Sequence, residues 1–166
     1  MPTGFLEAFH ARFYEVRTGF QEDHPERWRA LQGPYPEFVA LLRHRSSEAT
    51  LAIATAKDRR SVRLLLEDHG LSDLFPDERL MDKETGHSKT AHLQHLQAAL
   101  QMAFPDMTFV DDKVNHLDAV ASLGVRCVLA GWGYNGAREH ELAEQRGYVV
   151  CSPEDAEGRL FGRGNT

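Results

Sequence analysis

The chain of 166 residues lacks the patterns that mark secreted, membrane-spanning and zinc-stabilised proteins. Its two cysteines, Cys127 and Cys151, each lie in an apolar run, which is typical of buried thiols in a reducing compartment and not of a disulfide framework. No apolar run reaches membrane length, and no signal segment opens the chain. His92 and His95 are three residues apart on a predicted helix, but no nearby ligand completes a zinc site. These absences favour a cytoplasmic protein that contacts no membrane.

The composition also limits the choice of partners and the number of domains. The formal net charge is −6, so a nucleic-acid-binding surface is not favoured. Hydrophobic residues make up 42% of the chain, which is ordinary for a globular protein. A length of 166 residues suits one domain with a sizeable core and a small appendage.

From residue 36 onward, short apolar runs alternate with amphipathic segments of helical spacing. Strands are predicted at residues 50–56, 79–81, 107–110, 125–130 and 148–151. Asp58 and Ser88 are suited to cap the helices that follow them. This order predicts an α/β fold, with a Rossmann-like parallel sheet covered by helices on both faces. A separate amphipathic helix is predicted at residues 3–17, and the break from Gly33 to Pro36 divides it from the sheet.

Two adjacent carboxylates, Asp111 and Asp112, follow the predicted strand that ends at Val110. Carboxylates at this position lie at the carboxyl edge of a parallel sheet, where α/β folds bind ligands. Their charges repel each other unless a cation lies between them, and Mg²⁺ prefers one or two carboxylates completed by water and phosphate. The pattern therefore indicates a magnesium site, and the plain alternative is a strand end with two solvated aspartates.

Three segments in this order resemble the later motifs of the haloacid dehalogenase-like (HAD) phosphohydrolase superfamily. They are the run from Leu51 to Thr55, the pair Ser88-Lys89, and the run from Phe109 to Ala119. The run from Val128 to Tyr134 is similar to that superfamily's final core strand and loop. Each motif alone is weak, and the resemblance depends on their order and spacing over roughly residues 33–160.

The resemblance implies roles for individual residues. Thr55, with Ala56, would bind the transferring phosphoryl group, and Lys89 would neutralise its charge, with Lys83 as the fallback for the motif lysine. Asp112 would bind Mg²⁺, with Asp111 as its neighbour. The alternatives are an ordinary threonine at a strand end and a solvated lysine in a first helical turn. Relatives often carry Asp or Asn where this chain has His116.

The first motif of the superfamily, an Asp-x-Asp pair that supplies the nucleophile, occurs nowhere in the 166 residues. In the superfamily the strand before it lies between the two strands that end here at Thr55 and at Asp111. We therefore expect three parts: a partial helical cap at 1–33, a HAD-like α/β core at 34–161, and a loose tail at 162–166. The missing strand is expected to lie upstream in a longer gene, to come from another chain, or to be absent because the neighbouring strands close up.

The resulting hypothesis is a Mg²⁺-dependent HAD-type phosphatase acting on a small phosphomonoester, inactive as this truncated chain. The alternative is a non-catalytic HAD-like domain that binds a small phosphorylated metabolite or receives its nucleophile strand from another chain. A receiver-like domain fits less well, because its acid pair precedes its lysine. An open sheet gap would favour a homo-oligomer. We expect Phe5, Phe9, Phe13 and Trp28 to pack within the cap in preference to lining a substrate pocket.

Overall fold

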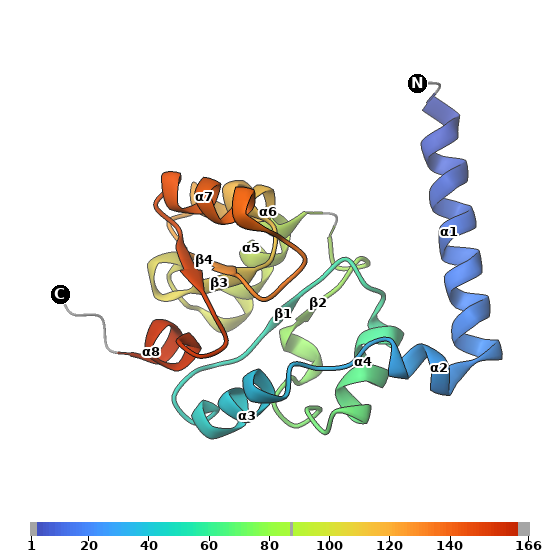
Figure 1. Cartoon of the computed structure of the whole chain (residues 1–166), viewed down its shortest axis with the longest axis horizontal. Coiled ribbons are helices and arrows are strands. Elements are labelled where there is room, and N and C mark those ends of the chain that lie inside the picture. Colours follow the sequence, from blue (N-terminus) through green and yellow to red (C-terminus); the bar gives the residue numbers. More distant parts are fainter. Residues whose placement is uncertain (1–2, 87, 163–166) are drawn as a thin grey trace. The chain divides into compact units, whose positions relative to one another are not determined.

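The computed structural model describes residues 3–86 and 88–162, and the chain divides into two compact units, Met1–Pro34 and Tyr35–Thr166 (Figure 1). The first unit holds α1 (Thr3–Asp23) and α2 (Pro25–Ala30). The predicted helix at residues 3–17 therefore exists but continues to Asp23. Of the described helices, none combines the length and apolarity needed to cross a membrane.

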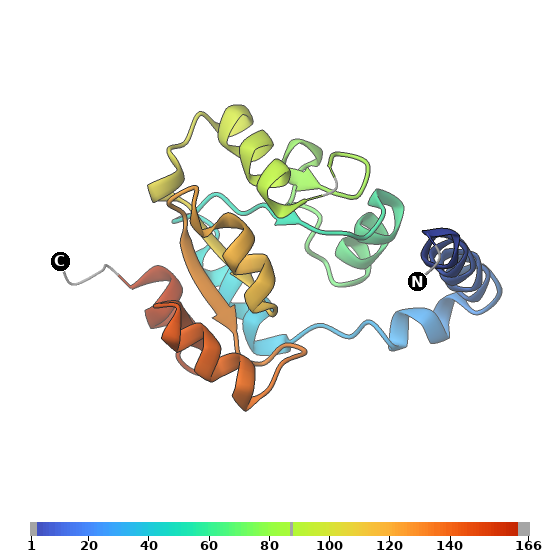
Figure 2. The ribbon, with the colours of Figure 1, turned by 90° about the horizontal axis from the view of Figure 1, so that it is seen from above.

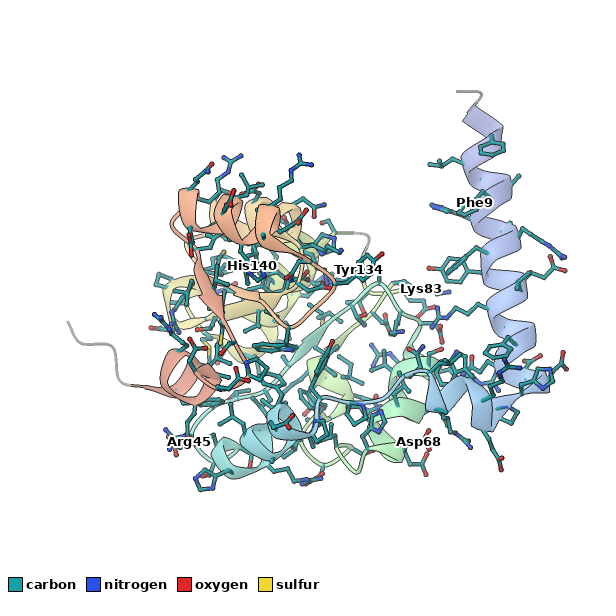
Figure 3. The ribbon with its side chains drawn as sticks, in the orientation of Figure 1. Phe9, Arg45, Asp68, Lys83, Tyr134 and His140 are labelled. Carbon is teal, nitrogen blue, oxygen red and sulfur yellow. The ribbon has the colours of Figure 1, made fainter. Side chains whose placement is uncertain are left out.

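The apolar stripe of α1 is exposed, which contradicts the expectation that its phenylalanines pack within the cap. Phe5, Phe9 and Phe13 are each more than half exposed, as are Leu6 and Val16 (Phe9 is labelled in Figure 3). Trp28, by contrast, is buried. One long helix and one short helix offer too few apolar partners to cover both faces of α1.

The second unit has the alternating order of an α/β fold, and every strand pairing in it is parallel. Its elements are α3 (Pro36–Arg45), β1 (Ile53–Ala54), α4 (Arg59–Asp68), β2 (Leu80–Met81), α5 (Lys89–Leu100), β3 (Thr108–Asp111), α6 (Val114–Ala121), β4 (Arg126–Ala130), α7 (Ala137–Gln145), β5 (Val149–Cys151) and α8 (Ala156–Phe161). Short 3-10 turns lie at Asp77–Arg79 and Phe104–Asp106. The α/β prediction is confirmed at this level. Of the predicted tail at 162–166, all but Gly162 lies outside the described residues.

The strands form two sheets and not the single sheet that the sequence predicts. One sheet has the order β1-β2 and the other has the order β3-β4-β5. The strand predicted at residues 50–56 extends only over Ile53–Ala54, because its partner β2 has only two residues with which it can pair. Within the described residues, β1 and β3 each have a sheet neighbour on one side only, and they do not pair with each other.

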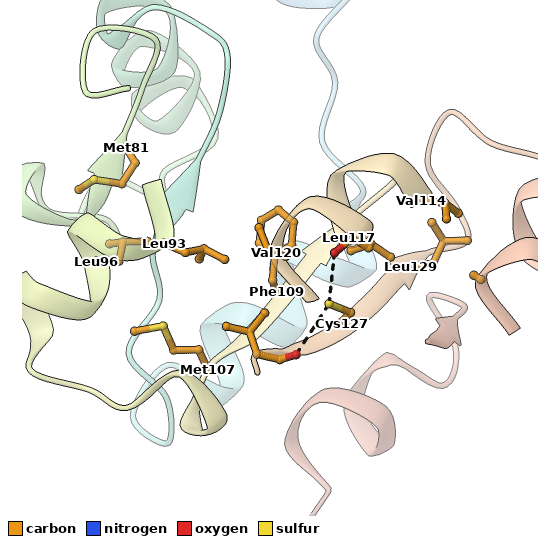
Figure 4. Packing of buried hydrophobic residues seen from close by; sticks show 12 residues of the cluster. Met81, Leu93, Leu96, Met107, Phe109, Val114, Leu117, Val120, Cys127 and Leu129 are labelled. Carbon is orange, nitrogen blue, oxygen red and sulfur yellow. Dashed lines mark hydrogen bonds between the residues drawn. The ribbon is translucent and has the colours of Figure 1, made fainter. Parts of the chain in front are cut away.

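Helices cover both faces of the three-stranded sheet. Successive residues of a strand point to opposite sides, so neighbouring residues pack against different helices. Phe109, Cys127 and Leu129 belong to a core cluster with Leu93 of α5 and Leu117 of α6, drawn in Figure 4. The alternate positions, among them Val110 and Val128, pack with residues of α3 and α8. Figure 2 shows α6 and α8 on different sides of β4.

Local signals place several of these elements as predicted. The Asp58 carboxylate accepts a hydrogen bond from Ser61 N at 2.8 Å and caps α4, and the Ser88 hydroxyl accepts one from Ala91 N at 3.1 Å and caps α5. Both cysteines are free and buried, which confirms the prediction of buried thiols. Cys127 Sγ donates to the carbonyl oxygens of Leu117 and Val125 (Figure 4).

Candidate functional site

Lys89, the first residue of α5, joins the carboxyl ends of β1 and β3. Its Nζ donates to the carbonyl oxygen of Ala54 at 2.6 Å and lies 3.3 Å from Oδ2 of Asp111. The side chains of Lys89 and Asp111 are 15% and 10% exposed, so this ion pair is largely shielded from water. The strands β1 and β3, which do not pair with each other, thus both contact the Lys89 ammonium at their carboxyl ends.

Thr55 and Ala56 lie directly after β1, in the bend that leads towards α4. The Thr55 backbone N–H donates to Met81 O at 2.8 Å, and its hydroxyl oxygen accepts from Lys57 N at 3.1 Å. Within the described residues the hydroxyl hydrogen makes no hydrogen bond, so it can be donated to a ligand. Both residues lie at the end of β1 whose carbonyl oxygen, that of Ala54, binds Lys89.

Lys83, the alternative to Lys89 as the site lysine, has a different environment. It forms an ion pair with the adjacent Glu84 at 3.8 Å, and its side chain is 40% exposed. Such an exposed pair contributes little energy. Of the two lysines, Lys89 is the one that contacts Asp111.

Both oxygens of the Asp111 carboxylate are occupied by protein groups. Oδ1 accepts from Lys113 N at 3.0 Å and lies 2.9 Å from Nδ1 of His116, while Oδ2 faces Lys89. His116 therefore pairs with the first aspartate of the motif. A carboxylate with these partners anchors the neighbouring elements, and it is a poorer direct metal ligand than its neighbour Asp112.

Asp112 is held by the loop between β4 and α7. Its Oδ2 accepts a hydrogen bond from Tyr134 N at 2.8 Å. In the part of the chain that the structure describes, Oδ1 makes no hydrogen bond. A Cβ at Gly133 would lie 2.2 Å from the Asp112 Cβ, so only glycine fits beside this carboxylate. The loop thus fixes one oxygen of Asp112 and leaves the other free to bind a ligand.

Asn135 and His140, which sequence reasoning missed, hold this loop in place (Tyr134 and His140 are labelled in Figure 3). The Asn135 side-chain amide donates to Asp112 O at 3.1 Å and to Ala130 O at 2.9 Å. Its oxygen lies 2.7 Å from His140 Nε2. Asn135 and His140 are four and nine residues beyond Gly131, and nothing in their spacing marks them as site residues.

Lys113 and Tyr134 add a half-buried cation and an exposed ring beside Asp112. Lys113 Nζ donates to Tyr134 O at 2.5 Å and lies 4.5 Å from the centre of the Tyr134 ring. This geometry is that of a cation–π contact, which is worth about 0.5–1 kcal/mol at an exposed site. The two side chains thereby tie the start of α6 to the loop that holds Asp112.

The donors around Asp112 are oxygen atoms, the type of ligand that Mg²⁺ prefers. The described residues contain no group of three or more His, Cys, Asp or Glu side chains able to hold a metal ion, whereas zinc sites use three or four such ligands. Mg²⁺ accepts one or two carboxylates and completes its shell with water and substrate phosphate. Asp112, with one unbonded oxygen, fits this requirement. His92 serves another purpose, since its Nε2 lies 2.9 Å from the carbonyl oxygens of both Asp82 and Gly86.

No family model matches the chain. The tyrosine-protein kinases PtkA of Mycobacterium bovis and Mycobacterium tuberculosis are each 27% identical to it over 127 residues, which is 74% of this chain and 43% of theirs. The chain therefore spans less than half the length of the curated relatives that it matches. The proteins to which it is similar carry names that denote phosphoryl transfer to tyrosine.

Proposed function

We propose that the Tyr35–Thr166 unit is a HAD-like domain built to hold a phosphoryl group. Its completed site would act as a Mg²⁺-dependent phosphohydrolase on a small phosphomonoester. The observation that carries this proposal is the position of Lys89, which contacts both the end of β1 and Asp111. Phosphoryl transfer depends mainly on positioned cations and donors around the equatorial oxygens.

Each residue has a role that its contacts support. Thr55 and Ala56 would bind phosphoryl oxygens through the free hydroxyl hydrogen and the backbone, and Lys89 would neutralise the charge. Asp112 would hold Mg²⁺ through its unbonded oxygen, and a bound Mg²⁺ would withdraw charge from the phosphoryl oxygens. Asp111 would orient Lys89 and would not bind the metal directly.

The nucleophile is not among the 166 residues, because no Asp-x-Asp pair occurs in them. In the superfamily this motif follows a strand that lies between the counterparts of β1 and β3. The unpaired edges of β1 and β3 support the idea that one more strand belongs there. We therefore propose that these residues alone turn over no substrate, and that a nucleophile strand from outside these residues would complete the site.

The relatives support a second candidate function. They are named tyrosine-protein kinases, and a kinase also binds phosphate and Mg²⁺ but passes the phosphoryl group to a hydroxyl. A third candidate is a non-catalytic domain that binds a small phosphorylated metabolite with the same residues. All three candidates share phosphate binding by Lys89 and Mg²⁺ binding by Asp112, and they differ in the fate of the phosphoryl group.

The phosphate and Mg²⁺ binding that the three candidates share is tested by measuring thermal stability in the presence of Mg²⁺ and inorganic phosphate. A ligand that binds the folded chain raises the unfolding temperature. We expect this rise in the wild-type chain and its loss in Asp112→Asn and Lys89→Met, while Lys83→Met retains it. An equal rise in all four proteins would contradict the proposed site.

Turnover is tested with p-nitrophenyl phosphate and Mg²⁺. The purified chain is expected to hydrolyse it no faster than buffer does. Robust hydrolysis that disappears in Asp112→Asn would show that the nucleophile lies within these residues. Incubation with labelled ATP and a tyrosine-containing peptide distinguishes the kinase candidate, because only a kinase labels the peptide.

A further inference from the structure

A buried polar network lies beneath the turn that joins β2 to α5. Its centre is Asp82, the residue after β2, which is 1% exposed. The Asp82 carboxylate accepts hydrogen bonds from Arg59 Nε at 2.6 Å and from the Thr85 hydroxyl at 2.8 Å. It also accepts from the backbone N–H groups of Glu84 and Thr85, at 3.1 and 2.9 Å. A buried charge of this kind is tolerated because it is paired and fully hydrogen-bonded.

Arg59 connects this carboxylate to the two-stranded sheet. It is the first residue of α4, and its Nη2 donates to Leu80 O at 2.7 Å in addition to the bond to Asp82. Burial alone would raise the pKa of Asp82, but the hydrogen bonds from Thr85 and the Arg59 guanidinium hold that pKa below its ordinary value. The turn is therefore fixed to β2 through a charged group that stays ionised.

His92 fixes the same turn from the side of α5. Its ring is 2% exposed, and Nε2 lies 2.9 Å from the carbonyl oxygens of Asp82 and Gly86. Gly86 itself lies so close to α5 that an added Cβ would be 3.2 Å from Ala91 Cβ and 3.4 Å from the His92 ring. His92 is three residues beyond Lys89, so it lies one helical turn along the same helix.

We infer that Asp82, Thr85 and His92 are positioning residues that set where α5 begins and so where the Lys89 ammonium lies. This inference rests on the function proposed above for Lys89. Lysine has a flexible four-carbon stem, and its ammonium can be held at a defined point only if its backbone is held first. The network supplies that constraint from both sides of the turn, while Ser88 caps the helix itself.

The test follows the reactivity of Lys89, which depends on how well its ammonium is held between Ala54 O and Asp111. Limited acetylation across a range of pH, read by mass spectrometry, gives the labelling rate of Lys89 relative to Lys113 within the same molecule. We expect Thr85→Val to raise this ratio about fivefold, the effect of losing one typical hydrogen bond. Thr85→Ser, which keeps the hydroxyl, should stay within about twofold of the wild type.

Asp82→Asn is expected to disturb the network more than Thr85→Val does, and Asp73→Asn is its matched control. Asp73 also pairs with an arginine, Arg43, but that pair is exposed and includes no residue of the buried network. We expect the Lys89 ratio to rise further in Asp82→Asn and not to change in Asp73→Asn. Because Asp82→Asn can unfold the chain, Thr85→Val is the deciding variant.

An unchanged Lys89 ratio in Thr85→Val, at a temperature where the variant is folded, would overturn the inference. A role confined to stability would lower the unfolding temperature without altering that ratio. Failure of the proposed function gives a different result, since the wild-type chain would then show no stabilisation by Mg²⁺ and inorganic phosphate. The labelling experiment needs no ligand, so the two failures are distinguishable.

Discussion

The ammonium of Lys89 lies 3.3 Å from the carboxylate of Asp111, although the two residues belong to different elements, α5 and β3. The same ammonium bonds to the carbonyl oxygen of Ala54 at the end of β1. A single side chain therefore links the two sheets at the edge where the candidate site lies. Several expected outcomes depend on this link and on the groups around it.

Replacing Lys89 by methionine should destabilise the chain by about 2–4 kcal/mol, because Asp111 would keep a largely buried charge without its cation. Urea unfolding followed by circular dichroism measures this change. Lys83→Met is the control, and since Lys83 is much more exposed we expect a change within about 0.5 kcal/mol. Equal losses in the two variants would contradict a special role for the Lys89 pair.

Gly133→Ala should cost about 1–3 kcal/mol, because the new Cβ would collide with Asp112 and force the loop aside. Gly19→Ala in α1 is the matched control, since an added Cβ meets nothing within 4 Å there. In the interior of a helix that change should stabilise by about 0.5–1 kcal/mol. The two substitutions are thus expected to shift the urea midpoint in opposite directions, and a shift of the same sign would refute the close contact.

The Asp82 carboxylate is expected to cause part of the acid sensitivity of the chain. Burial opposes ionisation, but the hydrogen bonds from Thr85 and Arg59 hold the folded-state pKa of Asp82 below its ordinary value, so the folded state binds fewer protons than the unfolded state. Its contribution to stability is therefore complete above about pH 4 and is lost as the pH falls through the lowered pKa. Unfolding by urea between pH 2.5 and 6 should show a smaller pH dependence in Asp82→Asn than in the wild type. An identical dependence would show that Asp82 is not the responsible group.

The apolar stripe of α1 should tolerate polar substitution within the chain. Phe9 is 58% exposed, so Phe9→Ser should change the unfolding free energy by less than about 1 kcal/mol. Trp28→Ala, in the same unit, removes a side chain that is 3% exposed and should cost about 3–5 kcal/mol. Thermal unfolding followed by circular dichroism compares the two, and a large loss in Phe9→Ser would mean that the stripe is covered in solution.

The elements that local chemistry specifies were predicted well from the sequence. Asp58 before α4 and Ser88 before α5 act within one helical turn, so their capping effect is readable from neighbouring residues. The length of β1 was overestimated, because a strand's extent depends on its partner and β2 is short. The end of α1 was placed too early, since the polar residues after Arg17 are as compatible with a helix as with a loop.

The site was predicted less completely than the fold. The family resemblance implies site roles for Thr55, Lys89 and Asp112, with Asp111 as a neighbour at the metal, and these roles stay predictions. The structure adds that the Asp111 oxygens contact Lys89, Lys113 and His116. Asn135 and His140 were missed. Hydrogen bonds between side chains far apart in the sequence leave no periodic signal, so only coordinates reveal them.

The sequence by itself determined the order of strands and helices, the helix caps, the buried state of both cysteines and the absence of an Asp-x-Asp pair. These properties depend on composition, on spacing, and on interactions within a few residues. Only the tertiary structure decided that the strands form two parallel sheets, that Lys89 and not Lys83 reaches Asp111, and that the pair Arg59 and Asp82 lies buried beneath the turn before α5. Each of these depends on which distant residues become neighbours, and that is settled by packing of the whole core.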